Sequence, residues 1–184
     1  MTDTVKIVFT GIMGAGKTEA IRVISDIEVV STDVEATDEV RELKKTTTVA
    51  MDYGEVTLDD ATTLALYGTP GQERFRYMWE ILVKGALGIV IMLDNSRDDP
   101  LQDLAMYLEN FSAYFDSCCV VVAVTHSDIC TLPDLDMYRK FMRDKNYLFP
   151  IYRIDAREKS QVLLLIESML AMIDVAQGEW RVQG

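Results

Sequence analysis

Residues 11–18 of the chain read Gly-Ile-Met-Gly-Ala-Gly-Lys-Thr and match the pattern Gly-x-x-x-x-Gly-Lys-(Ser/Thr). In such a loop, glycines let successive backbone N–H groups point at phosphate oxygens. The apolar run Val5–Thr10 before the loop predicts a buried strand, and Lys17–Asp26 after it predicts a helix. A helix adds its positive N-terminal end to such a site. The stretch therefore predicts a nucleotide site at a strand-to-helix junction.

The side chains that end this loop indicate the chemistry. We expect Lys17 to reach the β- and γ-phosphates and the Thr18 hydroxyl to bind Mg²⁺, because the pattern uses these residue types in that way. The candidate nucleotide-binding residues in the loop are Gly11, Met13, Gly14, Ala15, Gly16, Lys17 and Thr18. The alternative is a helix start with a coincidental lysine, and the strand before the loop weighs against it.

Short apolar runs and helical stretches alternate along the rest of the chain. The further strands are expected at Met51–Leu58, Leu64–Gly68, Leu87–Asp94, Cys118–Thr125 and Phe149–Ile154. The further helices are expected at Phe75–Lys84, Pro100–Tyr114, Leu135–Lys145 and Lys159–Ala176. This alternation predicts an α/β fold, with a mostly parallel six-stranded sheet covered by helices on both faces. Ile27–Ser31 is a candidate extra edge strand, and Thr32–Thr47 is expected to be a loop.

The chain of 184 residues is expected to form one domain. We find no internal repeat, low-complexity segment or Pro/Gly-rich linker that would divide it. The predicted domain covers residues 1–177, and residues 178–184 form a short C-terminal tail.

Charge and composition exclude several classes of function. The net charge is −12, which argues against binding to nucleic acid or to an anionic membrane surface because like charges repel. Solubility alone is an equally good explanation of the acidity. No apolar run approaches the length of a membrane span, and neither end shows a secretory signal or a lipidation motif. Three cysteines do not make a disulfide framework, so we expect a cytoplasmic protein with no direct membrane anchor.

Four further segments resemble the motifs of Ras-like small GTPases. Residues 68–76 read Gly-Thr-Pro-Gly-Gln-Glu-Arg-Phe-Arg and resemble switch II, and residues 125–128 read Thr-His-Ser-Asp, where the family reads guanine. Residues 155–157 read Asp-Ala-Arg, where the family has Ser-Ala-Lys, and Thr46–Thr48 resembles the switch I threonine. The order is that of the family. Residues 46–54 and 66–72 are most similar to bacterial Ras-like GTPases related to the MglA polarity and motility switches.

The resemblance implies a three-layer P-loop GTPase fold and a GTP/GDP-binding switch that hydrolyses GTP slowly with Mg²⁺. The implied catalytic residues are Gln72, Lys17 and Thr48, and the implied metal ligands are Thr18 and Thr48. The implied nucleotide contacts outside the phosphate loop come from Gly71, Thr125, His126, Asp128, Ala156 and Arg157. Asp128 would accept two hydrogen bonds from the guanine edge, which adenine cannot supply.

Three residues depart from the family pattern. Gly68 stands where switch II has an aspartate that holds Mg²⁺ through water. Asp52 and Asp33 are candidate replacements, although a solvated carboxylate is the simpler interpretation of each. His126 replaces a lysine that stacks on the base, and Met13 stands where many members have glycine. Crowding of Gln72 by Met13 predicts slow intrinsic hydrolysis.

The residues leave alternatives open for activity and partners. Leu87–Asp94 ends in an aspartate, as a Walker B strand of a P-loop kinase or ATPase does. A hydrolysis-poor, nucleotide-locked binding module is a second alternative. The resemblance implies an activator or exchange factor, commonly a roadblock/LC7-domain protein, and an effector that binds the switches. On the switch II helix, the residues that could form an apolar effector face are Tyr77, Met78, Trp79 and Ile81, although aromatic residues at helical spacing more often belong to the core.

Overall fold

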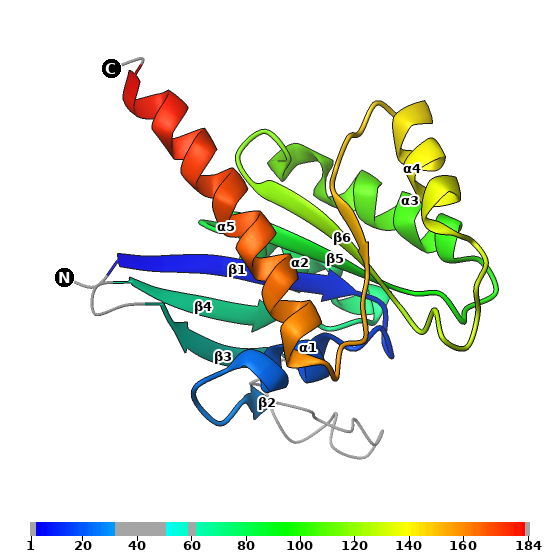
Figure 1. Ribbon diagram of the computed structural model, residues 1–184, viewed down its shortest axis with the longest axis horizontal. Helices are drawn as coiled ribbons and strands as arrows, with labels where there is room; N and C mark the ends of the chain where they lie inside the picture. Colours follow the sequence, from blue (N-terminus) through cyan, green and yellow to red (C-terminus); the bar gives the residue numbers. More distant parts are fainter. Residues whose placement is uncertain (1–2, 32–50, 59–61, 183–184) are drawn as a thin grey trace.

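The computed structural model describes residues 3–31, 51–58 and 62–182, without the side chains of 177 and 179–182. These residues form one seven-stranded sheet with the order β2-β3-β4-β1-β5-β6-β7 (Figure 1). The strands are β1 (Asp3–Gly11), β2 (Val30–Ser31), β3 (Asp52–Thr57), β4 (Thr62–Gly68), β5 (Gly88–Asp94), β6 (Cys119–Thr125) and β7 (Ile151–Arg153).

The sheet is parallel from β4 to β7 and antiparallel at its other edge. β1 pairs in parallel with β4 and β5, and β6 pairs in parallel with β5 and β7. β3 runs antiparallel to β4, and β2 is antiparallel to β3. The expected mostly parallel α/β sheet is confirmed. The described part of the chain has seven strands rather than six, because Val30–Ser31 adds the candidate edge strand.

Helices cover both faces of the sheet and make three layers. The helices are α1 (Lys17–Ile24), η2 (Glu73–Phe75), α2 (Arg76–Val83), α3 (Pro100–Phe111), η3 (Ser112–Tyr114), α4 (Leu135–Asp144) and α5 (Lys159–Val182). Figure 1 shows α5 crossing the near face of the sheet beside α1, with α2 and α3 behind the strands. α5 continues six residues past its expected end at Ala176.

The core consists of two hydrophobic clusters, one on each face of the sheet. Alternate residues of β1 divide between them, with Ile7 and Phe9 on the α1 and α5 side and Val8 on the α2, α3 and α4 side. β5 alternates in the same way and is buried from Gly88 to Leu93. Burial on both faces explains why these strands read as continuous apolar runs.

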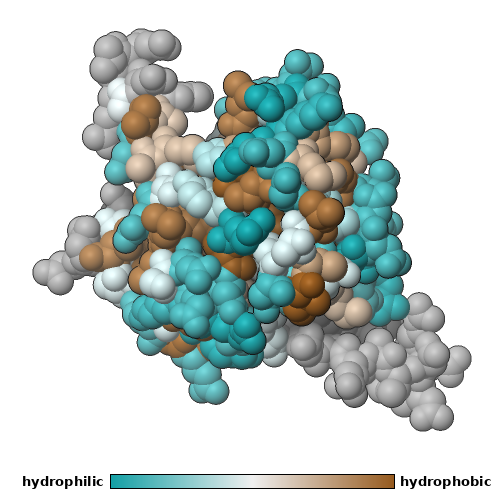
Figure 2. Space-filling view, turned by 45° about the vertical axis from the view of Figure 1, so that its right-hand side comes forward, coloured by the Kyte–Doolittle hydropathy of each residue, from teal (hydrophilic) through white to brown (hydrophobic). Residues whose placement is uncertain are grey.

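The surface offers few hints of its own about function. Figure 2 shows hydrophobic and hydrophilic side chains intermixed on the face that it presents. Among the helices that the structure describes, none is both long and apolar enough to pass through a bilayer.

Candidate functional site

The predicted site residues gather at the carboxyl ends of the parallel strands. β1 ends at Gly11, β4 at Gly68, β5 at Asp94 and β6 at Thr125, and parallel pairing brings these ends to one edge of the sheet. Ligands of open α/β sheets bind in the crevice outside this edge. The four loops that follow the strands therefore form the candidate site.

The phosphate loop is held in shape by Lys17. The Lys17 ammonium donates hydrogen bonds to the carbonyl oxygens of Gly11 at 2.7 Å and Ile12 at 2.8 Å. Gly16 precedes α1 with φ of +89°, a conformation that residues with a side chain rarely adopt. No side chain caps the N-terminus of α1, so its first N–H groups face the site, as anion binding requires.

Lys17 is buried, with an exposed fraction of 7%. This burial lowers its pKa to about 8, and the nearby charge of Asp52 opposes part of the shift. Within the described part of the chain, Asp52 is the anionic neighbour of this buried ammonium, and an additional anion would compensate it further. The electrostatics of the loop thus favour a phosphate group beside Lys17.

Asp52 corrects an interpretation made from the sequence. The solvated carboxylate expected there is instead buried, with an exposed fraction of 8%. Its Oδ2 accepts a hydrogen bond of 2.6 Å from the Thr18 hydroxyl, and its Oδ1 accepts one of 2.5 Å from Ser31. The sequence named Asp52 as a candidate, but it could not show that β3 runs beside the start of α1.

The segment after β4 lies directly against the phosphate loop. A Cβ added to Gly71 would lie only 2.3 Å from the backbone nitrogen of Met13, so glycine alone allows this approach. The segment is anchored by Trp79, whose Nε1 donates to the Pro70 carbonyl at 2.8 Å. Gln72 is exposed, and it lines a cavity of about 370 Å³ together with Met13, Lys17, Thr18, Asp52 and Gly71.

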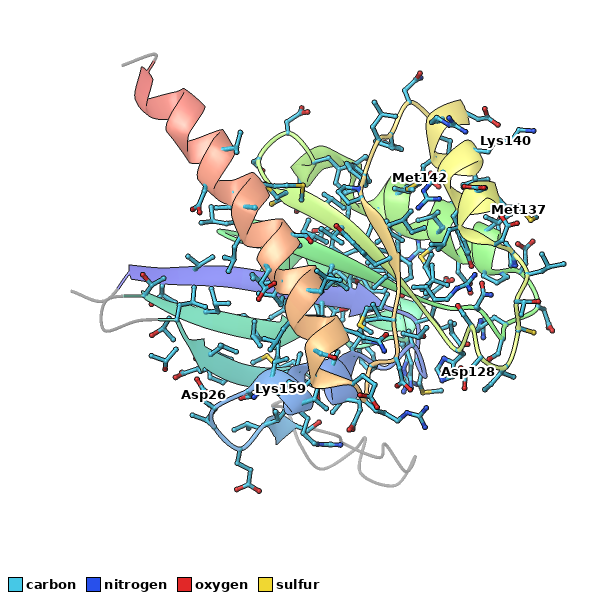
Figure 3. All side chains as sticks on the ribbon, viewed as in Figure 1. Asp26, Asp128, Met137, Lys140, Met142 and Lys159 are labelled. Atoms are coloured by element: carbon cyan, nitrogen blue, oxygen red, sulfur yellow. The ribbon has the colours of Figure 1, made fainter. Side chains whose placement is uncertain are left out.

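A second cavity of about 600 Å³ adjoins the first, and Gly14 and Gly16 line both. Its other predicted residues come from two loops and are Thr125, His126, Asp128, Ala156 and Arg157. Asp128 is exposed, and Figure 3 places it in the loop that follows β6. A Cβ added to Gly16 would lie 2.8 Å from the Cβ of Ala156, so the loop after β7 packs on the phosphate loop.

Buried polar contacts fix the loop after β6. The Thr125 hydroxyl lies 3.0 Å from the Leu93 carbonyl oxygen and 3.2 Å from that of Ala15, which ties this loop to the phosphate loop. His126 has a positive φ of 56°, and its Nδ1 lies 3.1 Å from Oδ1 of Asp94. The imidazole is thus held by the end of β5 beside the cavity.

Two residues that the sequence analysis missed support the same loop. Asn95 donates to the Cys130 carbonyl at 2.6 Å, and the Tyr138 hydroxyl donates to Oδ1 of Asn95 at 2.7 Å. Asn95 directly follows the predicted strand 87–94, so its position at a strand end was the signal available. Tyr138 lies on α4 and had no such signal.

Asp155 and Arg157 form an exposed ion pair at the far wall of the second cavity. Arg157 donates from Nη2 to Oδ2 of Asp155 at 2.6 Å and from Nε to Oδ1 at 2.9 Å. These hydrogen bonds lower the pKa of Asp155 to about 2. The pair closes the turn from β7 to α5, and Ala156 between the two residues lines the cavity.

Two predicted site residues lie outside the described residues, and the four candidates on α2 differ in their burial. Thr48, the expected switch I threonine and metal ligand, and Asp33 lie outside the described residues. On α2, Met78 and Trp79 are buried in the core, whereas Tyr77 and Ile81 are 50% and 56% exposed. An effector face on this helix is therefore limited to its exposed residues.

A family model described as a conserved hypothetical ATP binding protein, ATP_bind_1, matches residues 26–181. The chain belongs to the ATP_bind_1 family. The match begins after the phosphate loop and covers the remaining three loops of the site. With the phosphate loop that precedes the match, membership of ATP_bind_1 makes the chain a nucleotide-binding P-loop protein.

The chain is also similar to individual proteins, two of which are Ras-related. An uncharacterized protein of Methanocaldococcus jannaschii is 32% identical over 101 residues, which cover 55% of this chain and 58% of the relative. The Ras-related protein Rab-5B of Plasmodium falciparum is 24% identical over 60% of this chain and 53% of its own length. The chain thus spans little more than half of these two relatives.

A third relative matches along most of the chain. The Ras-related protein Rab-18 of Lymnaea stagnalis is 25% identical over 183 residues, which cover 96% of this chain and 84% of the relative. These similarities agree with the P-loop GTPase fold that the seven-stranded sheet displays.

Proposed function

We propose that the protein is a GTP/GDP-binding molecular switch that hydrolyses GTP slowly with Mg²⁺. The observation that carries the proposal is the pair of adjoining cavities, which share Gly14 and Gly16. The first contains groups suited to phosphates, Lys17 and Thr18, and the second contains Asp128. A nucleotide seated with its phosphates in the first cavity would extend its base into the second.

Asp128 supports guanine as the base. A carboxylate accepts hydrogen bonds, and guanine offers N1–H and an exocyclic amine side by side, whereas adenine offers no such pair. We assign to Asp128 the recognition of this edge, and to the N–H of Ala156 that of the guanine O6.

The family description favours ATP as a second candidate, so the contacts of Asp94 matter. In a P-loop kinase or ATPase, this strand-end carboxylate would serve the metal beside the phosphate-loop hydroxyl. Here the Thr18 hydroxyl bonds to Asp52, and Asp94 accepts from Ser96 and lies against His126. This arrangement supports a GTPase rather than a P-loop kinase or ATPase.

Hydrolysis would be slow without a partner. Gln72 is the residue we assign to the attacking water, because it lines the phosphate cavity and is exposed to solvent. Met13 lines the same cavity with 69% of its surface exposed, which places a flexible apolar side chain near Gln72. An activator that displaces Met13 and adds positive charge would accelerate the reaction.

The nucleotide state would be read through the loop after β4. Gly71 lies against the phosphate loop, so a third phosphate there would bear on this loop directly. We assign the chain to the MglA-related bacterial group, with a roadblock/LC7-domain protein as regulator. The exposed Tyr77 and Ile81 are candidates for the effector surface.

The test of guanine recognition is the variant Asp128→Asn, with Asp136→Asn as the matched control. Asp136 is an exposed carboxylate on α4, and it does not line either cavity. Loss of hydrogen bonds to a charged group predicts about 10–100-fold weaker GTP binding by Asp128→Asn, measured by titration calorimetry. The control should bind as the wild type does, and an unaltered Asp128→Asn would refute the guanine assignment.

A second test concerns the switch itself. The affinity of a roadblock/LC7-domain partner is measured for the GDP form and for the form with a non-hydrolysable GTP analogue. A switch requires different affinities, because a ligand shifts an equilibrium only by its differential binding to two states. Equal affinities would leave a nucleotide-locked binding module as the function.

A further inference from the structure

Gly68 leaves the site without a carboxylate at the end of β4, and the register of the sheet shows what lies opposite. Asp52 on β3 is the direct antiparallel partner of Gly68. Directly opposed residues of an antiparallel pair point to the same face of the sheet. A side chain at position 52 therefore emerges on the face where a side chain at position 68 would.

The carboxylate of Asp52 also fills the space that a side chain at 68 would need. A Cβ added to Gly68 would lie 2.9 Å from Oδ2 of Asp52 and 3.0 Å from its Cβ. Both distances are shorter than ordinary van der Waals contact. Gly68 and Asp52 are thus complementary, since a side chain at 68 is excluded while Asp52 occupies this space.

The carboxylate of Asp52 contacts residues at the phosphate cavity. Its Oδ2 accepts a hydrogen bond of 2.6 Å from the Thr18 hydroxyl, which leaves the oxygen lone pairs of Thr18 to face a cation. Ser31 holds the other carboxylate oxygen at 2.5 Å. Asp52 itself lines the cavity with Lys17 and Thr18.

Burial of this carboxylate adds a second argument. Asp52 is 8% exposed. Among the residues that the structure describes, it accepts hydrogen bonds from the neutral hydroxyl groups of Thr18 and Ser31, and Lys17 is a charged neighbour. A buried carboxylate is costly unless positive charge compensates it. A divalent cation that prefers oxygen ligands, seated at Thr18, would supply this charge together with Lys17.

We infer that Asp52 is the positioning carboxylate of the Mg²⁺ site and does from β3 what the family's aspartate does from β4. It orients the Thr18 hydroxyl and offers an acceptor for metal-bound water. The inference rests on the proposed function, because the cation enters with the nucleotide phosphates. Outer-shell partners of this kind change metal affinity by about 10–100-fold when they are removed.

The test measures the release of fluorescent mant-GDP from the full chain as free Mg²⁺ is varied with a chelator. Asp52→Asn removes the charge and keeps the shape, so the fold should persist. Glu55→Gln is the matched control, because Glu55 lies three residues along the same strand, on the opposite face. We expect Asp52→Asn to need about 10–100-fold more Mg²⁺ to slow release, and Glu55→Gln to match the wild type.

The exchanged pair Asp52→Gly with Gly68→Asp separates metal positioning from a structural role. Gly68 does not have a positive φ, and Asp52→Gly removes the two closest contacts of a Cβ at 68. The remaining one, 3.2 Å to the terminal Cδ1 of Ile21, requires a small shift of that flexible side chain. The pair should recover at least half of the lost Mg²⁺ affinity on a logarithmic scale. If Asp52 only helps to pack α1 against β3, moving the carboxylate to β4 would not restore the Mg²⁺ affinity.

The outcomes distinguish this inference from the proposed function. An unchanged Mg²⁺ requirement in Asp52→Asn, or an exchanged pair that recovers nothing, would overturn the role of Asp52 while guanine binding stands. A wild-type protein that does not bind mant-GDP would overturn the proposed function, and this inference with it.

Discussion

The contact between Gly16 and Ala156 holds the two halves of the site together, and it can be tested by substitution. In Gly16→Ala the new Cβ would lie 2.8 Å from the Ala156 Cβ, where ordinary contact begins at 3.4 Å. Overpacking of this kind costs about 1–3 kcal/mol. The positive φ of Gly16 adds about 1–2 kcal/mol for any residue with a Cβ. We therefore expect Gly16→Ala to lower the free energy of unfolding by about 2–5 kcal/mol.

Two controls separate the two costs. Gly85 also has a positive φ, +72°, but a Cβ there would meet no atom within 4 Å. Gly85→Ala should therefore cost only the strain of about 1–2 kcal/mol. Combining Gly16→Ala with Ala156→Gly removes the clash and keeps the strain, so the double variant should recover about 1–3 kcal/mol in a double-mutant cycle.

The assay is urea unfolding of nucleotide-free protein, followed by far-ultraviolet circular dichroism. Nucleotide must be removed, because ligand binding to the folded state would add its own stabilisation. A cost of Gly16→Ala no larger than that of Gly85→Ala would refute the predicted clash with Ala156. A double variant as unstable as Gly16→Ala alone would refute the clash as well, since residues 16 and 156 would then not be in contact.

Three further predictions concern the core, the rate and the ionisation of single groups. Trp79→Phe should lower the free energy of unfolding by about 1–3 kcal/mol in the same urea assay, because it removes a buried hydrogen bond and part of a packed ring. An unchanged free energy of unfolding would show that Trp79 does not anchor the loop after β4. Met13→Gly should raise the single-turnover rate of GTP hydrolysis by giving Gln72 room, and an unchanged rate would remove Met13 as the cause of slow hydrolysis. NMR titration should give Asp155 a pKa of about 2, and Arg157→Ala should return it toward the ordinary range. Because the folded-state pKa is lowered, any stabilisation by this exposed pair is present above the ordinary Asp pKa and is lost as pH falls toward 2.

The fold was predictable because its central strands carry an unambiguous pattern. β5 and β6 are buried on both faces, so their sequences are continuous apolar runs, and the helices between strands have their own spacing. β2 was harder to predict because two residues make no period, and only pairing with β3 defines it. The end of α5 at Val182 was missed because Gly178, a poor helix former, and the polar residues around it interrupt the apolar spacing after Ala176.

The candidate site was predictable where a motif names its residues, and unpredictable where tertiary contact decides. The phosphate loop follows from its spacing in the sequence, and Asp128 from the resemblance of residues 125–128 to a motif of Ras-like GTPases. The burial of Asp52 does not, because it depends on the register between β3 and β4 and on the position of α1. From the sequence, Met78 and Trp79 could have belonged to an effector surface or to the core. In the structure both side chains are buried beneath α2.

The measurement that tests the central claim most directly is nucleotide competition on the wild-type chain. Labelled GDP is bound in the presence of Mg²⁺ and then displaced by unlabelled GTP or by ATP. Recognition of guanine by Asp128 predicts that GTP displaces the label at concentrations at least about 100-fold lower than ATP requires. Displacement by ATP at equal or lower concentrations would contradict the claim that this is a guanine-nucleotide switch.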